Sequence, residues 1–326
     1  PHSEKVSYFN EIGCDFIEVS ISRRGKNLIT DLKLLLKYIK LIKLEKPFAI
    51  LTYTIKPNIY GGIASRLLRV PQLANITGLG TSFKTKSLLQ SIVLFLHKVA
   101  LNNSSFILFQ NEPNKLFFEK HGVRGRKHKL IPGSGVNLDY FYKMEYPKSD
   151  KIEFLFIGRI MKEKGIEQYI ETARYIKNKY PNTLFHIVGS FEDDYAEVIK
   201  GMEDEGIIKY HGRQNDVREF HKLAHCIIHP TYYPEGMSNV LLESAASGRP
   251  IITTEITGCK EIVDDRVNGL LVRQNNTKDL ISKVEEFLNL SLETKKQMGI
   301  NGRKKVEKSF SRQIVVEEYV KEISQL

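Results

Sequence analysis

Short apolar runs alternate with longer amphipathic stretches through the second half of the chain. The apolar runs predict strands at residues 151–160, 183–190, 207–213, 226–231 and 250–255. Apolar positions at helical spacing predict helices between them, at residues 165–180, 217–224 and 238–248. Short apolar strands that alternate with helices are typical of a parallel sheet with both faces covered. We therefore expect this half to form a Rossmann-like α/β domain.

The first half shows the same alternation less completely. Apolar runs predict strands at residues 14–21, 47–54 and 72–77, and further short runs close the half at 104–111 and 127–135. Amphipathic stretches predict helices at residues 28–46, 58–68 and 86–101. A Rossmann-like half normally opens with a strand, a helix and a second strand before this point. We therefore expect an N-terminal domain without its first β-α-β segment.

A polar segment that contains Pro147 separates the two halves. Residues 139–150 combine this proline with a polar end, which is typical of a linker. The length of 326 residues also favours two domains over one. We place the N-terminal domain at residues 1–146 and the C-terminal domain at residues 147–310.

Positive charge is concentrated in the first half. The chain carries a formal charge of +11, and residues 1–150 hold 23 Lys and Arg against 11 Asp and Glu. The remaining residues hold 26 against 27. This asymmetry favours an anionic partner, which can be nucleic acid, a phosphate-rich substrate or an anionic membrane surface. Because the sequence has no helix-turn-helix, zinc-finger or RNP pattern, nucleic-acid binding is the rival interpretation and not the expected one.

The cysteines and the apolar runs indicate the compartment. Cys14, Cys226 and Cys259 are widely spaced and form no CxxC pair, so we expect reduced thiols in a reducing compartment. No run approaches the roughly 18 apolar residues of a membrane span, and the first residues do not resemble a signal peptide. These features favour a cytoplasmic location.

A group of cations follows the first strand of the C-terminal domain. Gly158 ends this strand, and Arg159 and Lys164 lie in the loop that leads to the next helix. Ligands of open α/β sheets bind at the carboxyl ends of strands. An arginine there can contact two phosphate oxygens and a lysine adds a point charge, which favours a diphosphate site. The alternative is a solvated basic loop.

The stretch PEGMSNVLLE, residues 234–243, places two glutamates eight positions apart around a predicted helix start. Pro234 and Gly236 indicate a turn, and Ser238 is a candidate N-cap. The N-terminus of such a helix offers free N–H groups to an anion. Glu235 precedes the helix and Glu243 lies inside it among aliphatic residues. Taken alone, each glutamate is better explained as an ordinary charge, Glu235 of a loop and Glu243 of a helix surface.

The two segments together resemble the retaining GT-B glycosyltransferases of family 4. The resemblance rests on the Arg and Lys after the first strand and on the E-x7-E spacing, with supporting matches in HPTYYPEGMSNVLLESAASGRPII and GCKEIVDDRVNGLLV. Residues 54–83 resemble the subgroup that builds bacterial capsule, O-antigen and lipid-linked glycan chains. The resemblance implies two Rossmann-like doubly wound domains that face a central cleft. It also implies that the last helix, 311–326, packs back on the N-terminal domain.

The resemblance also assigns roles to residues. Arg159 and Lys164 would neutralise the diphosphate of the donor, Glu243 would hold the ribose hydroxyls, and Glu235 would contact the transferred sugar. The expected catalytic residues are thus Arg159, Lys164 and Glu235. Backbone amides of the helix start would face sugar and phosphate, so the remaining expected donor contacts are Gly158, Gly236, Met237, Ser238 and Asn239. On the acceptor side we expect Lys56, Asn58, Thr77, Gly78 and Gly80. Many relatives carry a histidine in this last region, where this chain has none.

We expect catalysis without a metal or another cofactor. Metal-dependent transferases usually use an Asp-x-Asp pair, and this sequence contains none. The adjacent Asp193 and Asp194 are better explained as a solvated helix start. The histidines show no spacing typical of metal ligands.

The sequence therefore predicts a retaining hexosyltransferase that uses a nucleotide sugar, with UDP favoured by the subgroup. The acceptor would be a glycan or a sugar linked to polyprenyl diphosphate, in the biosynthesis of bacterial surface polysaccharides or glycans. The basic first half would attach the protein peripherally to the inner face of the plasma membrane. The alternatives are a GT-B epimerase, an inverting transferase, a non-catalytic member and a non-enzymatic basic nucleic-acid-binding protein.

Overall fold

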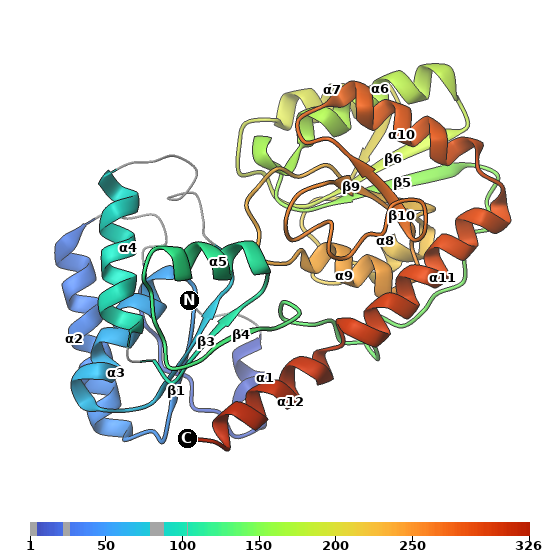
Figure 1. Cartoon of the computed structure of the whole chain (residues 1–326). Helices are drawn as coiled ribbons and strands as arrows, with labels where there is room; N and C mark the ends of the chain where they lie inside the picture. The colour runs from blue at the N-terminus through green and yellow to red at the C-terminus, as the bar shows by residue number, and fades with distance from the viewer. Residues whose placement is uncertain (1–4, 22–26, 79–87, 103) are drawn as a thin grey trace. The chain divides into compact units, whose positions relative to one another are not determined.

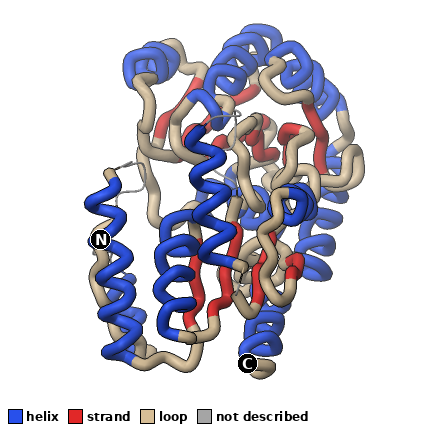
Figure 2. The backbone as a smooth tube through the Cα atoms, turned by 60° about the vertical axis from the view of Figure 1, so that its left-hand side comes forward, coloured by secondary structure: helices blue, strands red, loops and turns tan. Residues whose placement is uncertain are grey.

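The computed structural model describes residues 5–21, 27–78, 88–102 and 104–326, and Figure 1 traces them. The chain divides into two compact units. Unit 1 consists of Pro1–Phe109, Asn114–Lys129 and Gln325–Leu326, and unit 2 of Gln110–Pro113 and Leu130–Ser324. Both units are α/β structures in which helices flank a sheet (Figure 2).

This division differs from the domain boundary expected at residue 146. Residues 130–146 belong to unit 2 because their apolar side chains enter its core, where Val136 and Phe141 are buried. The backbone of Val136 also exchanges hydrogen bonds with Phe310 and Arg312. The last helix, α12 (Arg312–Ile323), is grouped with unit 2, and only the two residues at the chain end are grouped with unit 1.

Unit 2 contains a six-stranded parallel sheet. Its strands are β5 (Ile152–Ile157), β6 (Thr183–Val188), β7 (Ile208–Tyr210), β8 (Cys226–His229), β9 (Ile251–Thr254) and β10 (Gly269–Val272). Their order in the sheet is β10-β9-β8-β5-β6-β7, and all the neighbouring pairs are parallel. The helices are α6 (Ile166–Lys179), α7 (Ala196–Asp204), α8 (Arg218–Leu223), α9 (Asn239–Ala246), α10 (Thr277–Asn289) and α11 (Leu292–Ser309). This order confirms the Rossmann-like prediction for the second half.

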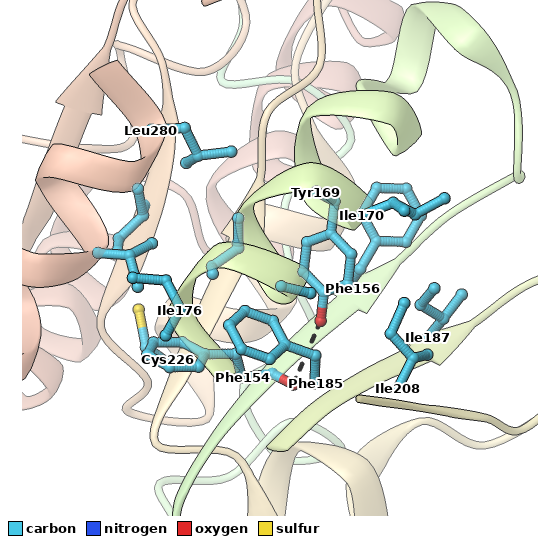
Figure 3. Close-up of a cluster of buried hydrophobic side chains, with 14 of the residues drawn as sticks. Phe154, Phe156, Tyr169, Ile170, Ile176, Phe185, Ile187, Ile208, Cys226 and Leu280 are labelled. Atoms are coloured by element: carbon cyan, nitrogen blue, oxygen red, sulfur yellow. Dashed lines mark hydrogen bonds between the residues drawn. The ribbon is translucent and has the colours of Figure 1, made fainter. Parts of the chain in front are cut away.

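Alternate residues of the inner strands fill two separate cores, one on each face of the sheet. On one face, Phe154 and Phe156 of β5 join apolar residues of α6, α7 and α10 (Figure 3). Phe154 stacks on Phe185 of β6, with 4.9 Å between the ring centroids. On the other face, Leu155 and Ile157 pack with residues of α9 and α11. Burial on both faces explains why the inner strands are largely apolar.

The sheet reverses its strand order between β5 and β8. The strands β5, β6 and β7 progress outward in one direction, whereas β8, β9 and β10 progress in the other. The loops after β5 and β8 therefore leave the same edge of the sheet in diverging directions. In open α/β sheets this point is where ligands bind.

Unit 1 contains a four-stranded sheet with the order β1-β2-β3-β4. The strands are β1 (Ile50–Tyr53), β2 (Gln72–Ile76), β3 (Phe106–Phe109) and β4 (His128–Leu130). The helices are α1 (Lys5–Glu11), α2 (Leu28–Glu45), α3 (Gly62–Leu68), α4 (Leu88–Leu101) and α5 (Glu112–Lys120), with a π-helical turn at Pro57–Gly61. Ala74, Ile107 and Phe109 form a core with Leu101 of α4 and Phe118 of α5.

One predicted strand of unit 1 is wrong. Residues 14–21 were expected to form a strand, but none of those described is in one. A strand is stable only beside a neighbour that accepts its hydrogen bonds, and the described sheet ends at β1. The apolar pattern of the segment was therefore insufficient to define its structure.

Candidate functional site

Two glycines allow the loops at the reversal point to approach each other closely. Gly165 precedes α6 with a φ of 78°, and a Cβ atom there would lie 2.2 Å from the carbonyl oxygen of Pro230. Gly189 follows β6, and a Cβ atom there would lie 1.8 Å from the carbonyl oxygen of Gly158. Neither contact tolerates a side chain. The end of β5 at Gly158 thus lies against the β6–α7 loop, and the start of α6 at Gly165 lies against the β8–α9 loop.

Arg159 extends from the β5–α6 loop and remains 40% exposed at its side chain. Its guanidinium donates at 3.2 Å to Oε2 of Glu192, which belongs to the neighbouring β6–α7 loop. Asp193 of the β6–α7 loop also holds the backbone of the β5–α6 loop, because its carboxylate accepts from the Lys162 N–H at 2.9 Å. The acidic pair predicted as a solvated helix start therefore contributes one member to holding the cation loop.

Lys164 is more deeply placed, with 12% of its side chain exposed. Its ammonium group forms an ion pair with Glu235, whose side chain is 15% exposed. Burial lowers the pKa of Lys164 to about 8, and the nearby positive charge of Arg159 acts in the same direction. The structure thus brings together the three residues predicted to be catalytic, although they come from two loops.

Helix α9 begins at Asn239, four residues after Glu235, and matches the predicted helix within two residues at each end. Ser238 occupies the N-cap position, but its side chain makes no capping hydrogen bond. Its hydroxyl lies 3.5 Å from His229 Nε2, and its N–H donates to the Gly258 carbonyl at 2.9 Å. The Ser238 amide, one of those expected to face the donor, is therefore already bonded within the protein.

Glu243 lies one helical turn beyond Asn239 on α9. Four residues advance the helix by about 6 Å and return to the same side, so the two residues share a face. Glu243 is partly exposed, whereas its neighbours Leu241, Leu242 and Ser244 are buried. This carboxylate therefore lies at the border of the core, on the side of the helix that carries an exposed Asn239.

Several residues at the site were not assigned by the sequence analysis. Gly258, in the loop after β9, packs against the Glu235–Gly236 turn: a Cβ atom there would lie 3.1 Å from the Gly236 carbonyl oxygen. Ser134 Oγ donates to Asn239 Oδ1 at 2.7 Å. Gly133, beside it, leaves room for Met237, because a Cβ atom would lie 2.7 Å from Met237 Cβ. The stretches GCKE and PGSG were visible in the sequence, but only the strand order shows which loop they meet.

In unit 1, three of the five predicted acceptor residues line one small cavity. The cavity measures about 10 Å³ and is bounded by Asn58, Thr77 and Gly78, together with His97. Asn58 donates from Nδ2 to the Asn75 carbonyl at 2.9 Å, and its buried Oδ1 has no hydrogen-bond partner in the part of unit 1 that the structure describes. A cavity of this size accommodates about one water molecule.

The other two predicted acceptor residues are not at this cavity. Lys56 pairs with Asp31 at 2.6 Å and does not line the cavity. Gly80 lies outside the described residues. The acceptor role of these five residues stays a prediction.

Among the residues that the structure describes, no group of three or more His, Cys, Asp or Glu side chains is arranged to hold a metal ion. Within the same residues, no helix combines the length and the apolar character needed to cross a membrane.

Comparison with protein families gave two matches. The model of glycosyl transferases group 1 matches residues 142–305, which include Arg159, Lys164 and both glutamates of the E-x7-E spacing. A model described as glycosyl transferase 4-like matches residues 2–111. The two matches together span most of both units.

Individual relatives agree with this family, and a solved structure shares the fold. The chain is 28% identical to the capsular polysaccharide biosynthesis glycosyltransferase CapM of Staphylococcus aureus, over 97% of this chain and 85% of the relative. It is 26% identical to the N,N'-diacetylbacillosaminyl-diphospho-undecaprenol alpha-1,3-N-acetylgalactosaminyltransferase of Campylobacter jejuni, over 88% of this chain and 80% of the relative. The structure of Anabaena HepE in complex with UDP-glucose superposes with a TM-score of 0.76 at 18% identity, covering 90% of this chain and 82% of that one. The GT-B fold class expected from the sequence is confirmed.

Proposed function

Because the chain belongs to the glycosyl transferases of group 1 and is therefore a glycosyltransferase, we propose that it transfers a hexose or an N-acetylhexosamine from a UDP-sugar to a lipid-linked glycan acceptor. The proposed transfer retains the anomeric configuration and needs no metal. The observation that carries the proposal is the grouping of Arg159, Lys164 and Glu235 at the point where the sheet reverses its order. Two cations on the β5–α6 loop there match the charge of a diphosphate.

The choice of donor and acceptor is supported by what similar proteins bind and modify. The HepE structure contains UDP-glucose. The Campylobacter relative is named for an acceptor sugar on diphospho-undecaprenol, and the Staphylococcus relative for capsular polysaccharide biosynthesis. We infer from these names that the acceptor of this chain is a glycan or a sugar on polyprenyl diphosphate, used in surface polysaccharide or glycan biosynthesis.

The chemistry of the proposed reaction follows from charge. When the bond between sugar and diphosphate breaks, negative charge grows on the leaving diphosphate and positive charge on the anomeric carbon. Arg159 and Lys164 would stabilise the leaving group in that transition state. Their two positive charges are the reason for proposing that no metal is needed. Glu235, which pairs with Lys164, would lie toward the transferred sugar. Its carboxylate would stabilise the positive charge that develops on the anomeric carbon.

The two units would divide the substrates between them. Glu243, at the border of the core on α9, would accept the ribose hydroxyls. The cavity of unit 1 that is bounded by Asn58, Thr77 and Gly78 would mark the acceptor side.

We also propose that the basic first half attaches the enzyme peripherally to the anionic inner face of the plasma membrane, where a lipid-linked acceptor lies. Co-sedimentation with phosphatidylglycerol vesicles but not with phosphatidylcholine vesicles would support this attachment.

A transfer assay tests the proposed reaction. Purified protein would be incubated with a panel of UDP-sugars and a short-chain polyprenyl-diphosphate sugar, with EDTA present, and the product would be examined by proton NMR. The proposal predicts UDP release and an axial new linkage that matches the donor anomer. An inverted anomer would indicate an inverting transferase, and isomerised free UDP-sugar without transfer would indicate an epimerase. Activity that is lost in EDTA and restored by Mg²⁺ would contradict the metal-independent part.

A further inference from the structure

A single aromatic ring contacts both cations of the candidate donor site. The Tyr233 ring centroid lies 5.5 Å from the Arg159 guanidinium carbon and 5.3 Å from Lys164 Nζ. Both distances are within the range in which the negative face of an aromatic ring attracts a cation. The cations come from the β5–α6 loop and the ring from the β8–α9 loop, so the ring connects the two sides of the reversal point.

The position of the ring is fixed by its own loop. The Tyr233 N–H donates to Thr231 Oγ1 at 3.2 Å, and this hydroxyl donates to the Glu163 carbonyl at 3.2 Å. The N–H of Tyr232 donates to the same carbonyl at 2.9 Å. Glu163 immediately precedes Lys164, so the backbone that carries the ring is bonded to the backbone that carries the cation. Thr231 is fully buried, which adds to the rigidity of this connection.

The other partners of the two cations are carboxylates, and they differ from the ring in one important respect. Arg159 pairs with Glu192 and Lys164 pairs with Glu235. A carboxylate holds a cation but also repels an incoming phosphate and competes for the same charge. A neutral ring attracts both cations without adding negative charge. It therefore reduces the cost of bringing Arg159 near Lys164 while leaving their net charge available to an anion.

We propose that Tyr233 is a positioning residue that holds Arg159 and Lys164 side by side for the two phosphates of the donor. The inference rests on the proposed function, because it takes the anion to be a diphosphate. Tyr233 acts through the two cations. Its effect should therefore grow with the number of phosphates in the ligand and vanish for a ligand without phosphate.

Calorimetric titration with uridine, UMP and UDP tests this inference. The variants are Tyr233→Leu, which removes the ring, and Tyr233→Phe, which keeps it. Tyr232→Leu serves as the matched control, because it removes the neighbouring aromatic side chain while preserving the backbone bond to Glu163. Tyr233→Leu should weaken UDP binding about 5- to 30-fold, whereas Tyr233→Phe and Tyr232→Leu should stay within about threefold of wild type. Uridine affinity should be equal in all four proteins, and UMP should show an intermediate loss.

The possible outcomes distinguish the inference from the proposed function. If wild type binds no UDP, the proposed function fails and the inference fails with it. If wild type binds UDP and Tyr233→Leu binds it equally well, only the role of Tyr233 is contradicted. Equal losses for uridine and UDP would mean that the ring shapes the loop in general, which also overturns the inference. A loss in Tyr233→Phe as large as in Tyr233→Leu would assign the effect to the hydroxyl instead of the ring.

Discussion

Lys164 and Glu235 form an ion pair although 71 residues separate them in the chain. The pair exists because β5 and β8 are neighbours in the sheet, so the loops that follow them leave the same edge. The side chains of both residues are largely buried. The pair lies where the strand order reverses, which is the position at which open α/β sheets bind ligands.

Replacing Lys164 with Ala should reduce kcat/KM for the UDP-sugar by about 100-fold or more, because a positive charge directed at the leaving group is lost. Lys162 provides a matched control. It lies in the same loop, but its side chain is 61% exposed and its ammonium group pairs with Glu167 at 3.4 Å. Lys162→Ala should stay within about threefold of wild type. Steady-state kinetics with both variants make the comparison, and near-normal turnover in Lys164→Ala would remove this residue from the mechanism.

The pH dependence of activity should show the titration of Lys164. The group carries its positive charge below its pKa of about 8 and loses it above. The profile of kcat/KM reports the free enzyme and should therefore fall on the alkaline side with an apparent pKa near 8. A Lys164→Arg variant keeps its charge through this range, so its profile should lack this alkaline fall even if its activity is lower. An unchanged alkaline fall in the arginine variant would assign the titration to another group.

Much of the second half was predictable from its sequence, and the ion pair was not. Short apolar strands alternate there with amphipathic helices, which is typical of a parallel sheet covered on both faces. This pattern predicted both the sheet and the location of Arg159 after its first strand. The contact of Lys164 with Glu235 depends on which strands are neighbours, and the apolar pattern carries no information about that order. The same reason explains why Tyr233, Ser134 and Gly258 were not assigned.

In the first half, the limits of prediction lie in the edge of the sheet and in the small cavity. Residues 14–21 have a strand-like pattern but are not part of the described sheet, because pairing and not composition makes a strand. Asn58, Thr77 and Gly78 line one cavity because they follow β1 and β2, which are neighbours. Lys56 does not line it, because its side chain pairs with Asp31 of α2, a contact that the strand pattern does not reveal.

Two glycine-to-alanine substitutions in unit 2 should change stability in opposite directions. Gly189→Ala places a Cβ atom 1.8 Å from the Gly158 carbonyl oxygen and should cost about 2 kcal/mol or more of unfolding free energy. Gly201 lies inside α7, and a Cβ atom there has nothing within 4 Å. Gly201→Ala should therefore add about 0.5 to 1 kcal/mol. Urea unfolding measures both changes, and equal effects would contradict the close approach of the loops at Gly189.

Unit 2 should lose stability in mild acid because of His221. Burial, aided by the charge of Arg249, lowers the pKa of His221 to about 3, while the unfolded chain has an ordinary value of about 6.5. The unfolded state therefore binds the proton first as the pH falls. The stability that this group contributes is complete above about pH 6.5 and is lost progressively between there and its folded pKa, by about 1 to 2 kcal/mol at pH 5. Urea unfolding at pH 7 and pH 5 should show a smaller difference in His221→Gln than in wild type, and an identical difference would assign the acid sensitivity to other groups.

The most direct test of the central claim is a thermal-shift screen of wild type and Glu243→Ala against UDP-, GDP- and dTDP-sugars. The account predicts that UDP-sugars raise the melting temperature of wild type and that Glu243→Ala loses this response, since the hydrogen bonds of a carboxylate to the ribose contribute about 1.5 to 3 kcal/mol. A Glu219→Ala variant, changed at an exposed position on α8, should respond like wild type. No stabilisation of wild type by any of these nucleotide sugars, or an undiminished UDP-sugar response in Glu243→Ala, would contradict the account.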